Sequence, residues 1–132
     1  MTQYTTAPSI DDIAELAERA LAAIPERLRR HVAGVAIAVE DLADDATIAE
    51  MGIENAWELS GLYRGTPLQY RDSGAAAPLP NLISLYRAPI LLEWVEEGED
   101  LSRLVSSVLV HEIAHHFGFS DADIEALEAE ME

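Results

Sequence analysis

One segment of the chain is more apolar than the rest, and it ends in a cluster of histidines. This segment, residues 101–117, has Asp100 where a helix N-cap is expected and Gly118 where a helix would end. The pattern therefore predicts a single helix. Only two serines interrupt the apolar run in its centre. A helix that is apolar on most sides has to be buried, so the rest of the chain is expected to pack around it.

Apolar spacing and turn residues divide the rest of the chain into short elements. Helices are expected over residues 9–24, 25–30, 44–51, 89–98 and 121–132. Strands are expected over residues 32–40, 59–64 and 82–87, with a loop over 72–81. In the first strand Val35, Ile37 and Val39 put bulk on one face. The alanines between them would let a helix pack closely on the other face.

These elements predict an α+β fold, in which a small mixed β-sheet packs on helices and the 101–117 helix is central. A length of 132 residues corresponds to one domain. We therefore expect residues 1–8 to be a flexible N-terminus and residues 9–132 to form a single domain.

The charge balance excludes several classes of partner. The net charge is −17, from 25 acidic residues against 8 arginines. Such a chain repels nucleic-acid phosphates and anionic lipid surfaces, whereas it is compatible with the capture of divalent cations. There is no cysteine, so any metal would have to be held by His, Asp or Glu.

The N-terminal residues show no targeting signal. Residues 1–8 are polar and uncharged, without a basic region or an apolar stretch. No segment approaches the roughly 20 apolar residues of a membrane span. We therefore expect the protein to be cytoplasmic.

Three of the four histidines fall within six residues, His111 to His116. On a helix, His111 and His115 lie four residues apart and project from one face. That spacing lets two ring nitrogens reach one metal ion at about 2.0–2.1 Å. Glu112 flanks the same face, where it could contact a water bound to the metal.

A third ligand is expected after the helix. Gly118 can adopt positive φ and turn the chain, which would bring Asp121 back toward the metal. Asp121 could instead cap the last helix, although Ser120 could do so with Asp123 as its capping-box partner. Glu125, one turn further on, is the alternative metal ligand.

The whole pattern, His-Glu-x-x-His-x-x-Gly-x-x-Asp over residues 111–121, resembles the active-site signature of zincin metallopeptidases. It is most similar to the small bacterial zincin-like, or minimal zincin, family. Residues 62–68 and 85–89 are similar to strand segments of that family, and the likeness spans roughly residues 10–125. The resemblance implies a zincin-like fold with one zinc ion bound by His111, His115 and Asp121.

The resemblance also implies a reaction, the zinc-dependent hydrolysis of peptide bonds in a peptide or protein substrate. Glu112 would be the general base that takes a proton from metal-activated water. The oxyanion would need a second electrophile, for which His116, Tyr86 and Arg87 are all candidates. A substrate strand would add to a sheet edge, for which the strand over 82–87 is our expectation.

Other functions fit the same residues. The chain could be a catalytically weak or inactive zinc-binding scaffold that serves as an interaction protein, or it could hydrolyse a non-peptide amide. The two histidines could also be core residues with internal hydrogen bonds and no metal. The sequence does not indicate the substrate or the oligomeric state.

Overall fold

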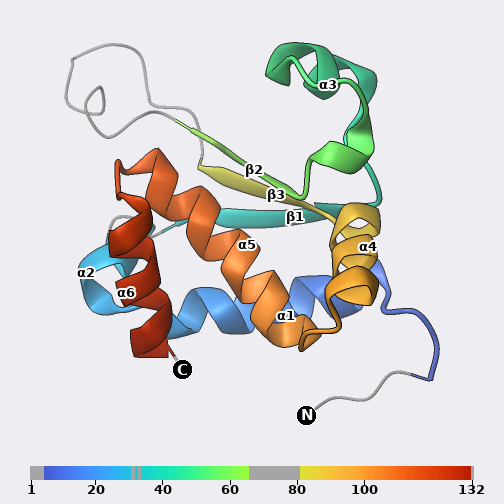
Figure 1. The fold of residues 1–132 in the computed structure, drawn as a ribbon. Coiled ribbons are helices and arrows are strands. Elements are labelled where there is room, and N and C mark those ends of the chain that lie inside the picture. The colour runs from blue at the N-terminus through green and yellow to red at the C-terminus, as the bar shows by residue number, and fades with distance from the viewer. Residues whose placement is uncertain (1–4, 31, 33, 66–80, 132) are drawn as a thin grey trace.

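The computed structural model describes residues 5–30, 32, 34–65 and 81–131 (Figure 1). Its helices are α1 (Ile10–Ala23), α2 (Glu26–Arg29), α3 (Asp45–Met51), the 3-10 helix η1 (Ala56–Glu58), α4 (Arg87–Glu97), α5 (Leu101–His116) and α6 (Asp121–Met131). Its strands are β1 (Ala36–Glu40), β2 (Gly61–Arg64) and β3 (Leu82–Tyr86). The loop expected over 72–81 lies outside the described residues, apart from its last residue. No described helix has the length and apolar character needed to cross a bilayer.

The strands form a mixed sheet in the order β1-β3-β2. β1 pairs in parallel with β3, with Ala38 opposite Ser84. β2 pairs antiparallel with β3, with Tyr63 opposite Ile83. The expectation that the strand over 82–87 forms a sheet edge is therefore wrong, because β3 is hydrogen-bonded on both sides. Among the described strands, β2 is an edge strand on the side away from β1.

The central strand β3 is buried on both faces. Ile83 and Leu85 are fully buried in the main core, which the helices complete. Tyr86 points to the opposite face, where it packs with Ala43 and Leu62 in a second, smaller cluster. This alternation follows from the two-residue period of a strand. The sheet therefore divides the large helical core from the small cluster near α3.

Helix α5 lies in the middle of the main core, as its sequence predicts. Figure 1 shows α1 and α5 on the same side of the sheet, with α6 beside the C-terminal half of α5. Val105, Leu109, Val110 and Ile113 of α5 have no solvent exposure. Burial of an aliphatic side chain of this size contributes roughly 1.5–3 kcal/mol. These contacts hold α5 in one rotational setting about its axis.

The helix boundaries follow the capping residues. The backbone N–H of Asp12 donates to Ser9 Oγ at 3.1 Å, and the N–H of Ser9 donates to Asp12 Oδ2 at 2.8 Å. This reciprocal pair confirms the capping box expected at the start of the first helix. Asp100 caps α5 as expected, through a hydrogen bond from the backbone N–H of Ser102.

The first strand departs from its prediction. β1 begins at Ala36, and Gly34 before it has a φ of 81°, a turn conformation that ends regular pairing. Ile37 and Val39 pack against the helical core. The helices therefore cover the bulky face of β1, and the expectation of a helix on its alanine face is wrong.

A glycine brings β2 close to α5. A Cβ atom on Gly61 would lie 2.9 Å from Val108 Cγ1 and 3.3 Å from Glu112 Cγ. Contacts below about 3 Å force neighbouring atoms to move, since protein interiors are close-packed. The absence of a side chain at Gly61 therefore sets how near the edge strand lies to the Glu112 turn of α5.

We predict that Gly61→Ala lowers the free energy of unfolding by about 1–3 kcal/mol, because the new methyl group overpacks this contact. The measurement is urea denaturation followed by circular dichroism. The control is the same substitution in a Val108→Ala chain, where the obstructing methyl groups are gone and the cost should fall. An equal cost in both backgrounds would show that Val108 is not the obstacle.

Candidate metal centre

The two histidines of the motif lie on the exposed face of α5. The rings of His111 and His115 have centroids 6.1 Å apart and planes inclined by 54°. Their side chains are 48 % and 57 % exposed, respectively. This position does not match that of two core histidines with internal hydrogen bonds, because both rings lie outside the buried face of α5. Their one-turn spacing leaves both rings accessible to a common ligand.

Helix α6 returns alongside α5 and places one carboxylate near each imidazole. His111 Nε2 lies 2.6 Å from Glu128 Oε1, and His115 Nε2 lies 3.4 Å from Asp121 Oδ1. Gly118, with a φ of 79°, provides the turn that reverses the chain between the two helices. The expected approach of Asp121 to the motif is therefore present, through a long contact.

The cap of α6 leaves the Asp121 carboxylate available. The backbone N–H of Asp123 donates to Ser120 Oγ at 3.2 Å, and the N–H of Ser120 donates to Asp123 Oδ2 at 3.2 Å. Ser120 and Asp123 thus form the capping box of α6, as the second of the two expected capping arrangements predicts. The cap of α6 therefore does not use the Asp121 side chain. The side chain of Asp121 is 93 % exposed and directed at His115.

Glu128 is a residue of the site that the sequence reasoning missed. The expected alternative ligand was Glu125, which is exposed, whereas the carboxylate beside His111 belongs to Glu128. At 3.6 residues per turn, a position seven residues after Asp121 lies about 20° away around the helix, and one four residues after lies about 40° away. The spacing between Asp121 and Glu128 was therefore the signal that could have identified it.

Glu112 lies on the other flank of α5, beneath β2. Its Cγ is close to Gly61, and the Tyr63 backbone hydrogen-bonds to its carboxylate. Burial raises the pKa of the Glu112 carboxyl above its ordinary value, while His115, the Tyr63 backbone and His111 act in the opposite direction. Glu112 is thus a partly desolvated carboxylate held beside the two imidazoles.

His116 is the one further candidate that lies near Glu112. Its ring stacks on Tyr63, with centroids 3.9 Å apart and planes inclined by 25°. Tyr63 belongs to β2, so His116 lies under the edge strand, four residues along α5 from Glu112. The stacking contact fixes the orientation of the imidazole.

The structure places Tyr86 and Arg87 elsewhere. Tyr86 is 2 % exposed in the small cluster on the far face of the sheet. Arg87 Nε donates to the Pro8 carbonyl at 2.5 Å, and its Nη1 lies 3.1 Å from Asp41 Oδ1. Neither side chain is brought together with the histidines, because β3 ends at the opposite end of the sheet from the last turn of α5 (Figure 1).

The side chains between α5 and α6 match a zinc site in their chemistry. Two imidazole nitrogens and two carboxylate oxygens are typical zinc ligands. Within the described residues, no group of three or more potential ligands is already arranged around one point. Each imidazole faces its own carboxylate instead, with the atoms that a metal ion would use turned toward each other.

The comparison with protein families supports this interpretation. The model of the zincin-like metallopeptidase family matches residues 32–131, from before β1 to the end of α6. The chain belongs to the zincin-like metallopeptidase family. The small mixed sheet and its helices are consistent with the α+β fold of zincin-like proteins, and membership implies a metallopeptidase type of function with a bound metal, typically zinc. A search among curated proteins found no match.

We predict that Gly118→Ala and Gly52→Ala each lower the free energy of unfolding by about 1–2 kcal/mol, because both glycines have positive φ. Neither added methyl group would meet an atom within 4 Å, so backbone strain is the common cause. Only Gly118 controls the approach of α6 to His115. NMR resonances of the His115 ring should therefore shift in Gly118→Ala alone, and equal shifts in both variants would contradict this role.

Proposed function

We propose that this zincin-like protein is a zinc-dependent metallopeptidase, with His111, His115 and Asp121 as metal ligands and Glu112 as general base. The observation that carries the proposal is the pairing of α5 imidazoles with α6 carboxylates next to a half-buried glutamate. In a chain of this family, these groups are the ones that metal-assisted hydrolysis requires. Glu128 is an additional carboxylate at the site, on the His111 side.

A bound zinc ion would supply a Lewis acid and lower the pKa of water at the site. Glu112 would accept a proton from the attacking water and pass it to the leaving nitrogen. Its partial burial favours this role, since a carboxylate with a raised pKa is a stronger base than an exposed one. His116, beside Glu112, is our proposed donor to the developing oxyanion.

The substrate would bind along β2. Among the described strands it is the edge strand beside Glu112 and His116, and an extended peptide would pair with its outer side by β-augmentation. Tyr63 and Gly61 face α5 from this strand. A peptide paired with β2 would therefore pass next to the proposed general base.

We predict that Glu112→Gln retains bound zinc but loses peptide cleavage by about 10²–10⁴-fold, the usual contribution of a general base. Cleavage is measured by mass spectrometry on a peptide library, and zinc by elemental analysis of the purified chain. Glu125→Gln, an exposed glutamate on α6, is the matched control and should cleave normally. Zinc-loaded protein that cleaves nothing would contradict a peptidase and support the scaffold alternative.

We also predict an order of zinc affinities among three α6 variants. Asp121→Asn should weaken binding most, by about 100-fold, and Glu128→Gln by about tenfold, whereas Glu125→Gln should have no effect. The affinities are measured by competition with a chromophoric chelator. A large loss in Glu125→Gln, with little or none in Asp121→Asn, would identify Glu125 as the ligand instead.

A further inference from the structure

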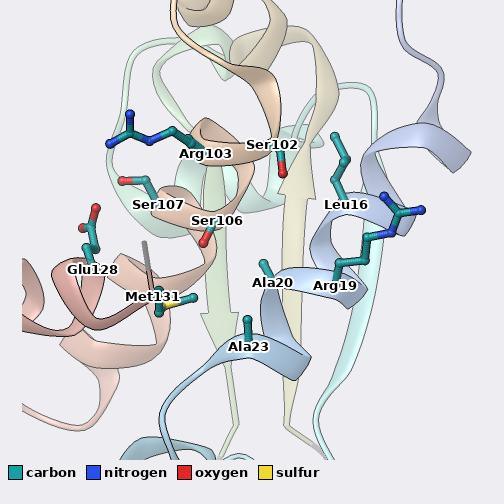
Figure 2. A pocket seen from close by; sticks show the side chains of 10 residues that line it. All are labelled: Leu16, Arg19, Ala20, Ala23, Ser102, Arg103, Ser106, Ser107, Glu128 and Met131. Carbon is teal, nitrogen blue, oxygen red and sulfur yellow. The ribbon is translucent and has the colours of Figure 1, made fainter. Parts of the chain in front are cut away.

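A groove of about 500 Å³ lies between α1, α5 and α6 (Figure 2). This volume is within the range of about 300–1,000 Å³ found for small-ligand sites. The residues that give the groove its chemistry are three serines of α5, one arginine each from α1 and α5, and a glutamate of α6: Ser102, Ser106, Ser107, Arg19, Arg103 and Glu128.

The groove begins at the candidate metal centre. Glu128, which lines it, is the carboxylate that lies 2.6 Å from His111 Nε2. Ser107 is one turn before His111 on the same face of α5, and Arg103 is one turn before Ser107. Figure 2 shows Arg103, Ser107 and Glu128 along one side of the groove. The groove therefore extends the metal centre along α5, on the flank away from β2.

The lining of the groove is richer in basic groups than the chain as a whole. The protein carries a net charge of −17, yet this groove is lined by two arginines and a single carboxylate. That carboxylate, Glu128, is already paired with His111. Guanidinium groups and serine hydroxyls are hydrogen-bond donors that suit a carboxylate ligand.

The two arginines stand at opposite rims of the groove (Figure 2). Arg19 pairs with Glu15 at 2.5 Å, but both side chains are more than 60 % exposed. An exposed pair of this i,i+4 type contributes only about 0.3–0.5 kcal/mol. A bound carboxylate can therefore compete with Glu15 for the Arg19 guanidinium at little cost.

We propose that this groove binds a carboxylate of the substrate, either an acidic side chain or a free C-terminus. The inference rests on the proposed function, because it places the carboxylate on the same chain that passes the metal centre. Two helical turns separate Arg103 from His111, which is about 12 Å along the axis. An extended peptide covers this distance in roughly three or four residues, so the anionic group lies that far from the cleaved bond.

The test measures binding of fluorescent peptides to zinc-loaded Glu112→Gln protein, in which cleavage cannot remove the ligand. One peptide has an internal acidic residue and an amidated C-terminus. A second has neutral side chains and a free C-terminal carboxylate, and a third is neutral and amidated. We expect one of the first two to bind about tenfold tighter than the third. The peptide that does so identifies which carboxylate the groove takes.

Substitutions of groove residues then test whether the preference for an anionic peptide arises in the groove. Arg103→Gln should remove most of the tenfold difference, and Arg19→Gln a smaller part of it, without changing the affinity for the neutral peptide. Arg30→Gln, an exposed arginine outside the groove, is the matched control and should leave the difference intact. Equal affinity for all three peptides, or a preference that survives both groove variants, would overturn the inference.

The experiments distinguish a failure of the groove inference from a failure of the proposed peptidase activity. A preference for the anionic peptide that depends on Arg103, in a chain that cleaves nothing, would support the groove and contradict the peptidase. Cleavage without any acidic preference would do the reverse. The circular dichroism spectrum of each variant must match that of the parent protein, which excludes unfolding as the cause.

Discussion

The burial of one side of α5 is the constraint on which the rest of the structure depends. Val105, Leu109 and Ile113 have no solvent exposure, so the helix cannot rotate without exposing them. The fixed rotation of α5 determines which neighbouring element each of its other faces contacts. The face that carries Glu112 meets β2, and the face that carries His111 meets α6. A half-buried carboxylate and a pair of imidazoles can therefore come from one helix and still point to two different surroundings.

The position of the α5 imidazoles offers a physical reason for the many acidic residues of α6. A chain with a net charge of −17 is subject to self-repulsion, and α6 carries many of its acids. Ile124 and Leu127 attach the helix by burial, and Arg27 holds its far end through Glu130 at 2.8 Å. Near the motif, Asp121 and Glu128 lie against the imidazole rings of His115 and His111, respectively. A divalent cation there would offset the repulsion and strengthen the docking of α6.

The α-helices were predictable from the sequence, but the 3-10 helix η1 and the pairing of the strands were not. Local signals such as the Ser9 capping box, Asp100 and Gly118 determine where helices begin and end, so these boundaries agree closely with the structure. The strand over 82–87 is recognisable in the sequence, but its alternation carries no information on pairing, and β3 lies at the centre of the described sheet rather than at its edge. The same holds for the site, where spacing predicted the approach of Asp121 but not that Glu128 would lie against His111.

The two flanks of α5 suit two different kinds of recognition. In the described part of the sheet β2 is an edge strand, and backbone hydrogen bonds to such a strand are ones that any extended peptide can make regardless of its sequence. In the proposed function, discrimination between substrates would therefore come from side-chain contacts. In the described residues, the polar groove on the α6 flank offers such contacts beside the candidate metal centre. Gly61 contributes to this division, because its missing side chain lets β2 lie close to Glu112. A larger residue there would separate the sequence-independent contacts from the proposed general base, while the groove would stay in place.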